Sequence, residues 1–357
     1  MNIFSCTQAE YVQQIYDRLG KGKRHAALLY SQWFKQGIVN PLIWAEPQAM
    51  PLVEEMWKGT EKVLPPVVSE QRDGSTVKFL LKMSDGLETE SVLIPMQAGV
   101  TLCISSQVGC RMGCTFCETG RMGLLRSLSV AEIISQVFVA RFVVNSPVRN
   151  IVFMGMGEPF DNYENVMQAI HILTDAGGFA IGPSRLTVST SGCVEEIYRF
   201  MREADPAVNL AVSINAPTEE LRTKIMPVNR KWSLAELRKA LIDYCAHPRR
   251  EILIEYVLLK DLNDSLTCAD QLAELLQGMR VRVNLIPYNA QRKSRFEPPE
   301  ENVQKAFAER LVERGYQVLL RHHKGRGIRA ACGQLGNKEK RKEWFQKDEM
   351  LNSEAHS

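Results

Sequence analysis

The sequence predicts an α/β fold, in which six βα units form a parallel sheet that is either open or curled into a partial barrel. Short apolar runs rich in β-branched residues recur six times after residue 100, and a helical segment follows each run after a loop. Two of these helical segments start with a Ser-x-x-Glu capping box, at residues 129–132 and 233–236. This alternation is typical of parallel sheets, because a helix must carry the chain back before the next parallel strand can begin.

The segments on either side of these units have different patterns. Residues 1–62 are polar and helix-patterned, and they predict a small helical accessory domain. Residues 63–100 predict a linker and then a β-hairpin, with strands at 76–83 and 89–96 separated by the turn sequence Ser-Asp-Gly. Residues 337–357 have mixed charge and few apolar positions, and they predict a surface helix that frays into disorder. The domain between them, residues 101–336, has its six strands predicted at 101–106, 150–157, 185–192, 209–215, 251–259 and 281–289.

The composition limits the class of protein. With 357 residues and 45% hydrophobic content the chain can bury a full core, which argues against a disordered or fibrous protein. We expect a cytoplasmic protein, because no apolar run approaches the roughly 20 residues of a membrane span and the first residues lack the pattern of a signal peptide. In that reducing compartment the nine cysteines are expected to be free, metal-bound or catalytic. The net charge of +3 indicates no partner, but basic clusters at residues 20–25 and 321–329 fit contact with an anionic surface.

Three cysteines share one predicted loop. Cys110, Cys114 and Cys117 have the spacing C-x3-C-x2-C, so three thiolates can converge on one metal centre. Structural zinc usually has four ligands in two separated pairs or with a nearby pair of histidines, and no such pair follows the triad. A cubane 4Fe–4S cluster held by three cysteines instead leaves one iron open for a substrate or cofactor. The spacing therefore favours an iron–sulfur cluster over zinc.

Small or polar motifs follow most of the predicted strands. In parallel α/β barrels the C-terminal ends of the strands converge on one pocket. Taken singly, each motif is also typical of an ordinary βα turn, in which Gly and Ser cap helices, but the shared position at strand ends favours a pocket. We expect the pocket to be lined by the cysteine loop and by the motifs GMGEP (155–159), STSG (189–192), SIN (213–215) and PYN (287–289).

The triad resembles the signature of the radical S-adenosylmethionine (SAM) superfamily, in which the amino and carboxylate groups of SAM chelate the open iron. GMGEP is similar to that superfamily's glycine-rich strand, which holds the SAM amino group. The stretches TLCISSQVGC, VFMGMGEPF, LTVSTSG, NLIPYN and AACGQL together resemble the RlmN/Cfr family, which methylates ring carbons of adenosine in RNA. The match runs from about residue 75 to 336, and GKGKRHAALLYSQWF is more loosely similar to the family's helical domain. The resemblance implies a partial (β/α)6 radical-SAM barrel, an N-terminal helical RNA-binding domain and an intervening β-hairpin.

The resemblance also implies roles for particular residues. Cys332 matches the cysteine that becomes S-methylated, Cys103 the second catalytic cysteine, and Glu90 the proposed base. Two stretches depart from the family pattern: the basic run GRGIR precedes Cys332 where acidic residues are more usual, and SIN stands where many members have Ser-Leu-His. The triad matches the cluster ligands, and the SAM-binding positions match Gly157, Glu158, Ser189, Ser213, Ile214, Asn215 and Asn289.

The family's chemistry explains why these residue types are needed. An adenosine ring carbon is electrophilic and cannot attack the SAM methyl group as an amine would, so a radical route is required. In the scheme that the resemblance implies, one SAM molecule methylates the Cys332 thiolate, and a second is reductively cleaved at the cluster to a 5′-deoxyadenosyl radical that takes a hydrogen from that methyl group. The methylene radical would add to the base and, after loss of one electron, leave the RNA covalently bound to Cys332. Glu90 would then remove a proton and Cys103 would attack Cys332, which leaves a disulfide that an external reductant must reset.

RNA as the substrate fits the two basic clusters, because neutralised phosphates supply most of the sequence-independent affinity. The target base must be unstacked and inserted into the pocket. Members of the family act on an adenosine of 23S ribosomal RNA at carbon 2 or carbon 8, and some also act on transfer RNA. We expect carbon 2 of the ribosomal adenosine on the resemblance alone, together with a flavodoxin or ferredoxin as electron donor and a monomeric enzyme.

Two other interpretations remain open from the sequence. A radical-SAM enzyme that acts on a protein or a small molecule would keep the cluster but would not need Cys103, Cys332 and the basic run. A non-catalytic RNA-binding or iron-sensing protein would keep an intact cluster and would not cleave SAM. The residues outside the triad favour the RNA methyltransferase.

Overall fold

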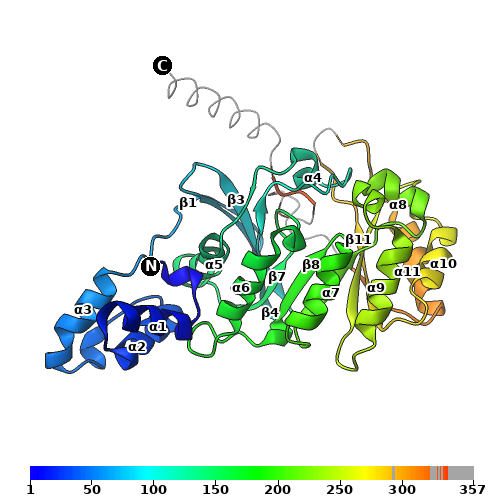
Figure 1. The fold of residues 1–357 in the computed structure, drawn as a ribbon. Coiled ribbons are helices and arrows are strands. Elements are labelled where there is room, and N and C mark those ends of the chain that lie inside the picture. Colours follow the sequence, from blue (N-terminus) through cyan, green and yellow to red (C-terminus); the bar gives the residue numbers. More distant parts are fainter. Residues whose placement is uncertain (292–293, 322–327, 329, 331–332, 337–357) are drawn as a thin grey trace, which may run out of the picture.

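The computed structural model describes residues 1–291, 294–321, 328, 330 and 333–336, within which ten strands form one sheet (Figure 1). The spatial order is β1-β2-β3-β4-β7-β8-β9-β10-β11-β12, so that β1 and β12 are the edge strands. The pairs from β1 to β4 are antiparallel and those from β4 to β12 are parallel. The strands are β1 (Val67–Asp73), β2 (Thr76–Lys82), β3 (Glu88–Met96), β4 (Gly99–Cys103), β7 (Val148–Phe153), β8 (Leu186–Thr190), β9 (Asn209–Ser213), β10 (Ile252–Leu258), β11 (Val281–Pro287) and β12 (Gln317–Leu320).

The predicted α/β class with a mainly parallel, open sheet is confirmed, and each of the six predicted βα strands is present as β4 and β7 to β11. The capping boxes are also present: the Ser129 and Ser233 hydroxyls accept the N–H of Glu132 and Glu236, whose carboxylates accept the cap N–H groups at 2.8 Å. A separate two-stranded ribbon pairs β5 (Gln107–Val108), which lies in the loop after β4, with β6 (Arg126–Ser127). The helices after residue 100 are α4 (Glu118–Met122), α5 (Val130–Phe138), α6 (Tyr163–Thr174), α7 (Val194–Glu203), α8 (Glu219–Ile225), α9 (Leu234–Cys245), α10 (Leu266–Leu275) and α11 (Glu301–Glu313).

Two edge strands were not predicted. Strand β1 lies where the sequence suggests a linker, and most of its residues are exposed, so it carries no apolar alternation. Strand β12 has only four residues, of which none is fully buried. Edge strands of this kind form because a neighbour supplies the hydrogen bonds, and short-range pattern gives little sign of them.

The predicted hairpin of β2 and β3 is present, and it continues the main sheet because β3 pairs with β4. Val92 of β3 lies opposite Cys103 of β4, and Glu90 lies two residues before Val92 on the same strand. Since side chains two apart on a strand share a face, as do directly paired residues, Glu90 and Cys103 project from the same face of the sheet. Strand β4 includes residue 100, where one domain boundary was predicted. The predicted boundaries at residues 62, 100 and 336 stay predictions.

The N-terminal helices α1 (Gln8–Leu19), α2 (Lys23–Gln36) and α3 (Met50–Lys58) lie together at one side of the molecule (Figure 1). Aromatic rings of α2 and of the segment before α1 contact the rest of the protein. The ring of Phe138 on α5 lies 5.2 Å from that of Phe4 and stacks on Trp33 at 4.6 Å. Phe34 of α2 meets Phe179 at 4.8 Å. Aromatic pairs at these distances add to the burial energy of each ring, so the helices and the barrel share one core.

No helix among the described residues is long and apolar enough to cross a membrane. The predicted charged tail, residues 337–357, lies outside the described residues.

Candidate active site

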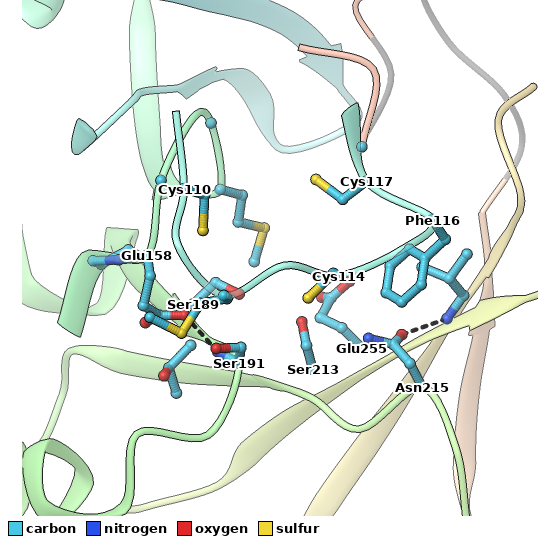
Figure 2. A pocket seen from close by; sticks show the side chains of 18 of the residues that line it. Cys110, Cys114, Phe116, Cys117, Glu158, Ser189, Ser191, Ser213, Asn215 and Glu255 are labelled. Carbon is cyan, nitrogen blue, oxygen red and sulfur yellow. Dashed lines mark hydrogen bonds between the residues drawn. The ribbon is translucent and has the colours of Figure 1, made fainter. Parts of the chain in front are cut away.

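A cavity of about 160 Å³ lies at the C-terminal ends of strands β7 to β11, under the cysteine loop (residues 104–117) that follows β4 (Figure 2). The expected strand-end motifs all contribute to it, because parallel strands bring their C-terminal ends to one side of the sheet. Its wall combines sulfur, hydroxyl, amide and carboxylate groups with apolar side chains. The lining includes Cys110, Met112, Cys114, Phe116, Cys117, Phe153, Gly157, Glu158, Ser189, Ser191, Ser213, Asn215, Glu255, Ile286, Tyr288 and Gly333.

The three cysteines of the triad face this one cavity (Figure 2). Backbone hydrogen bonds shape their loop: the Cys110 N–H donates to the Gly123 carbonyl, and the Cys117 N–H to the Cys114 carbonyl, both at 3.1 Å. Within the part of the chain that the structure describes, no three His, Cys, Asp or Glu side chains converge as ligands of a single metal ion. The three thiols therefore line a common space without meeting at one point.

This donor set fits a 4Fe–4S cluster. Three thiols around one cavity supply the soft ligands of such a cluster and leave one iron without a protein ligand. A single zinc ion would need all its sulfur ligands about 2.3 Å from one point. Burial raises the pKa of all three thiols, that of Cys114 to about 12. Since the thiolate is the ligand form, these groups would bind iron by releasing protons.

The glycine-rich turn after β7 approaches the cysteine loop closely. Gly157 has φ of +104°, and a Cβ at this position would lie 2.6 Å from the Gln107 Cβ and 2.8 Å from the Gln107 backbone nitrogen. The Glu158 side chain beside it accepts the N–H groups of Ser191 at 2.7 Å and Phe160 at 3.1 Å. Burial raises the pKa of Glu158, and these N–H bonds act in the opposite direction. A carboxylate held at this depth is suited to a positively charged amino group.

The ends of β8 and β9 place hydroxyl and amide groups on the cavity wall. Ser189, Ser213 and Asn215 line it, and the Asn215 amide oxygen accepts the N–H of Val257 at 2.8 Å. Ile214 lies between two lining residues, just after the end of β9, and is itself 1% exposed in the core.

One further predicted SAM-binding position lies beside the cavity. Asn289 is buried but does not line the wall, which Tyr288 lines instead. The structure thus brings most of the predicted SAM-binding positions together and sets Ile214 and Asn289 next to them.

The predicted base Glu90 lies on β3, outside the lining of the cavity. One carboxylate oxygen is 3.1 Å from the Lys78 ammonium nitrogen, and the other accepts the Gly336 N–H at 2.8 Å. The two charged side chains are only 13% and 9% exposed, so the pair is screened from water. Cys103, on the same face of the sheet, is 6% exposed and also lies outside the lining.

The predicted methyl-carrying residue Cys332 lies outside the described residues, but the segment after it, residues 333–336, is held against the start of α4, directly after the cysteine loop. The Gly333 carbonyl accepts the Glu118 N–H at 2.8 Å, and the Thr119 hydroxyl donates to the Leu335 carbonyl at 2.6 Å. Gly333 itself lines the cavity. The chain directly after Cys332 therefore forms part of the cavity wall.

Two buried charged side chains at this site were not predicted. Glu255 of β10 lines the cavity and is 6% exposed; one of its oxygens accepts the Asn284 amide at 2.7 Å, and the other has no hydrogen-bond partner among the described residues. Burial raises the pKa of Glu255, while Arg321 acts to lower it. The second is Lys78, the partner of Glu90. The available signal is the same for both: a lone charge inside an apolar strand run needs a buried partner or ligand.

A mainly parallel sheet with a three-cysteine loop over its strand ends defines the class of protein, and residues 104–268 match the family model of the Radical SAM superfamily. The chain is 52% identical over 346 residues to the probable dual-specificity RNA methyltransferase RlmN 1 of Protochlamydia amoebophila, and the match covers 97% of each chain. It is 43% identical over 328 residues to the dual-specificity RNA methyltransferase RlmN of Geobacter sulfurreducens, covering 90% of this chain and 88% of that one. The chain belongs to the RlmN family of radical-SAM RNA methyltransferases.

A solved structure agrees with this assignment. The crystal structure of a radical SAM methyltransferase from Sphaerobacter thermophilus superimposes with a TM-score of 0.86 at 36% identity, covering 94% of this chain and 99% of that chain. The family resemblance predicted from the motifs is confirmed.

Proposed function

We propose that this chain methylates carbon 2 of an adenosine in 23S ribosomal RNA, and that transfer RNA is its second substrate. The observation that carries the proposal is the cavity in which the cysteine triad faces Glu158, Ser189 and Ser213 at the strand ends. The dual specificity in the names of the relatives supports two RNA substrates. Carbon 2 is chosen on family membership alone.

Cys110, Cys114 and Cys117 would hold one 4Fe–4S cluster, and SAM would lie along the strand ends. When bound, these two groups supply the carbon radical that starts the reaction. The buried carboxylate of Glu158, next to Gly157, would take the SAM amino group. The polar groups of Ser189, Ser213 and Asn215 would fix the rest of the cofactor, and Ile214 and Asn289 would support it from beside the cavity.

Cys332 is the proposed methyl carrier, Cys103 the second thiol and Glu90 the base. Support comes from the neighbours of Cys332, because Gly333 lines the cavity and Gly336 donates to Glu90. The Lys78 ammonium is a counter-ion for the ionised Glu90 carboxylate, which is the form that accepts a proton. Attack of the Cys103 thiolate on the Cys332 sulfur would release the methylated base and leave a disulfide. An external thiol would return two electrons to it.

The N-terminal helices are the proposed RNA-binding domain. Lys21, Lys23 and Arg24 are exposed around the start of α2, where they can neutralise phosphates. We propose a monomer, an acidic flavodoxin or ferredoxin as electron donor, and a cytoplasmic location, since ribosomal and transfer RNA are found there.

Mass spectrometry of 23S ribosomal RNA and transfer RNA from cells with and without the gene tests the proposal. We expect 2-methyladenosine to be lost without the gene and restored by the wild-type gene but not by Cys332→Ala. Detection of 8-methyladenosine alone would assign carbon 8 with the same mechanism. RNA that is unmethylated in both strains would contradict an RNA substrate and favour a protein or small-molecule substrate.

The cluster assignment has a separate test. After anaerobic reconstitution we expect iron and sulfide in equal amounts, and neither in a variant with Cys110, Cys114 and Cys117 all changed to Ala. Cys268→Ala is the matched control, because this partly exposed cysteine lies on α10, away from the cavity. Stoichiometric zinc without iron would contradict the assignment.

A further inference from the structure

Helix α8 contacts both halves of the active site. The N–H and the hydroxyl of Thr115, between two cysteines of the triad, donate to the Ile225 carbonyl at 2.9 and 3.3 Å. Arg222 lies one turn earlier on the same helix and points to the ends of β8 and β9. A short helix thus joins the loop that would hold the cluster to the strand ends that would hold SAM.

The Arg222 guanidinium is 1% exposed and donates to several backbone carbonyls of these strand ends. Its Nη2 donates to the Ser191 carbonyl at 2.6 Å and to the Ser213 carbonyl at 3.1 Å, and its Nε donates to the Ile214 carbonyl at 3.2 Å. Its Nη1 donates to the Asn229 amide oxygen at 2.8 Å. A planar guanidinium can hold this many acceptors in one fixed geometry, which a lysine cannot.

The guanidinium of Arg222 is buried among neutral oxygens. Burial lowers the pKa of Arg222 to about 10. In the part of the chain that the structure describes, the hydrogen bonds of Arg222 go to backbone carbonyls and one side-chain amide. Because buried polar groups are costly without partners, loss of the guanidinium would leave these strand-end carbonyls unpaired.

We propose that Arg222 is a positioning residue that, through helix α8, couples the cysteine loop to the SAM-binding ends of β8 and β9. This inference rests on the proposed cluster and SAM site but not on the identity of the RNA target.

Two variants of the reconstituted holoenzyme test the proposal. Arg222→Lys keeps the charge and loses most of the carbonyl contacts, whereas Arg222→Gln loses both. We expect the Kd for SAM, measured by equilibrium dialysis without RNA, to rise roughly tenfold in each variant because the strand-end carbonyls are left unpaired.

Arg250 provides matched controls for the loss of a buried arginine. It is 7% exposed and precedes β10, at the opposite end of the strands, where it contacts the Met201 carbonyl and the Tyr244 ring. Arg250→Lys and Arg250→Gln should lower thermal stability and leave SAM binding unchanged. The same SAM affinity in Arg222→Lys, Arg222→Gln and the wild type would overturn the proposal, as would equal losses of affinity in the Arg250 variants. Since the measurement uses no RNA, a wrong RNA target would not alter these results.

Discussion

Cys332 and Cys103, which lie outside the triad, have different roles in the proposed reaction. Cys332→Ala should purify with an intact cluster and form no RNA product, because no thiolate accepts the methyl group. Cys103→Ala should form the bridge to RNA and then stall, because no thiol attacks Cys332. Denaturing gels should therefore show a stable protein–RNA band for Cys103→Ala only, and mass spectrometry should locate the crosslink at Cys332. Equal activity of both variants, or no trapped RNA in the Cys103 variant, would contradict the two-cysteine mechanism.

Gly157→Ala should disturb the site although it removes no functional group. The new Cβ would press on Gln107, and the residue would keep a positive φ that L side chains disfavour, at a cost of about 1–3 kcal/mol. We expect a lower midpoint of thermal unfolding and weaker SAM binding. Gly182→Ala is the control, since its φ is −60° and a Cβ there meets nothing within 4 Å, and it should match the wild type.

Functional residues of the site were predictable from the sequence where they lie close together along the chain. The triad was found because its three cysteines share one loop and need no distant partner. Glu255 and Lys78 were missed because their partners, Asn284 and Glu90, lie on neighbouring strands, and the sequence alone does not show which residues the sheet brings together. Ile214 and Asn289 lie beside the cavity, in the turns just after β9 and β11, and a sequence motif does not show which side chains of such a turn face the wall.

At the level of secondary structure, Arg126 of β6 joins the turn between β2 and β3 to the start of α5. Its guanidinium donates to both oxygens of Glu132 at 2.8 and 2.9 Å and also pairs with Asp85. Burial alone would raise the pKa of each carboxyl group, but the bonds from Arg126, together with hydrogen bonds from Leu87 to Asp85 and from Ser129 to Glu132, outweigh it and leave both pKa values below their usual range.

Arg126→Gln should therefore destabilise the protein in a pH-dependent way. A carboxylate whose folded pKa is depressed stabilises the fold above its usual pKa of about 4, and this stabilisation is lost as pH falls through the folded value. We expect a loss of about 1 kcal/mol at pH 7 that fades toward pH 3, measured by urea unfolding. Arg72→Gln, which removes an exposed pair with Glu70, should show almost no effect at either pH. A pH-independent loss in Arg126→Gln would contradict the assignment.

The six βα strands were predictable because each is a short, largely apolar run rich in β-branched residues that a helical segment follows. The same reasoning could not find β1 and β12. Their backbone pairing is with neighbours, and their side chains carry no pattern that separates them from loops. That the hairpin continues the main sheet was also not predictable, because the pairing of β3 with β4 depends on tertiary contacts rather than on local sequence.

For the molecule as a whole, the aromatic interface around Phe138 determines whether the N-terminal helices stay docked. Phe138→Ala should cost about 3–5 kcal/mol and increase hydrogen exchange in residues 1–58. Phe200→Ala is the control, because this buried ring packs on Phe160 within the barrel and should raise exchange around α7 instead. Unchanged exchange in residues 1–58 of Phe138→Ala would show that other contacts hold these helices. The sequence predicts their helical character but not this docking, because Phe4 and Phe138 are far apart along the chain.

The contact between Glu90 and Gly336 joins residues 246 positions apart in sequence. A ribosome making this chain releases the cysteine loop and most strands long before residues 333–336 emerge. An iron–sulfur cluster could thus be delivered to an open site during synthesis, and the end of the chain would close over it afterwards. A truncated product would lack both the proposed methyl carrier, Cys332, and the contact that holds the proposed base, Glu90. An incomplete chain could therefore hold iron, yet it could not begin the reaction on RNA.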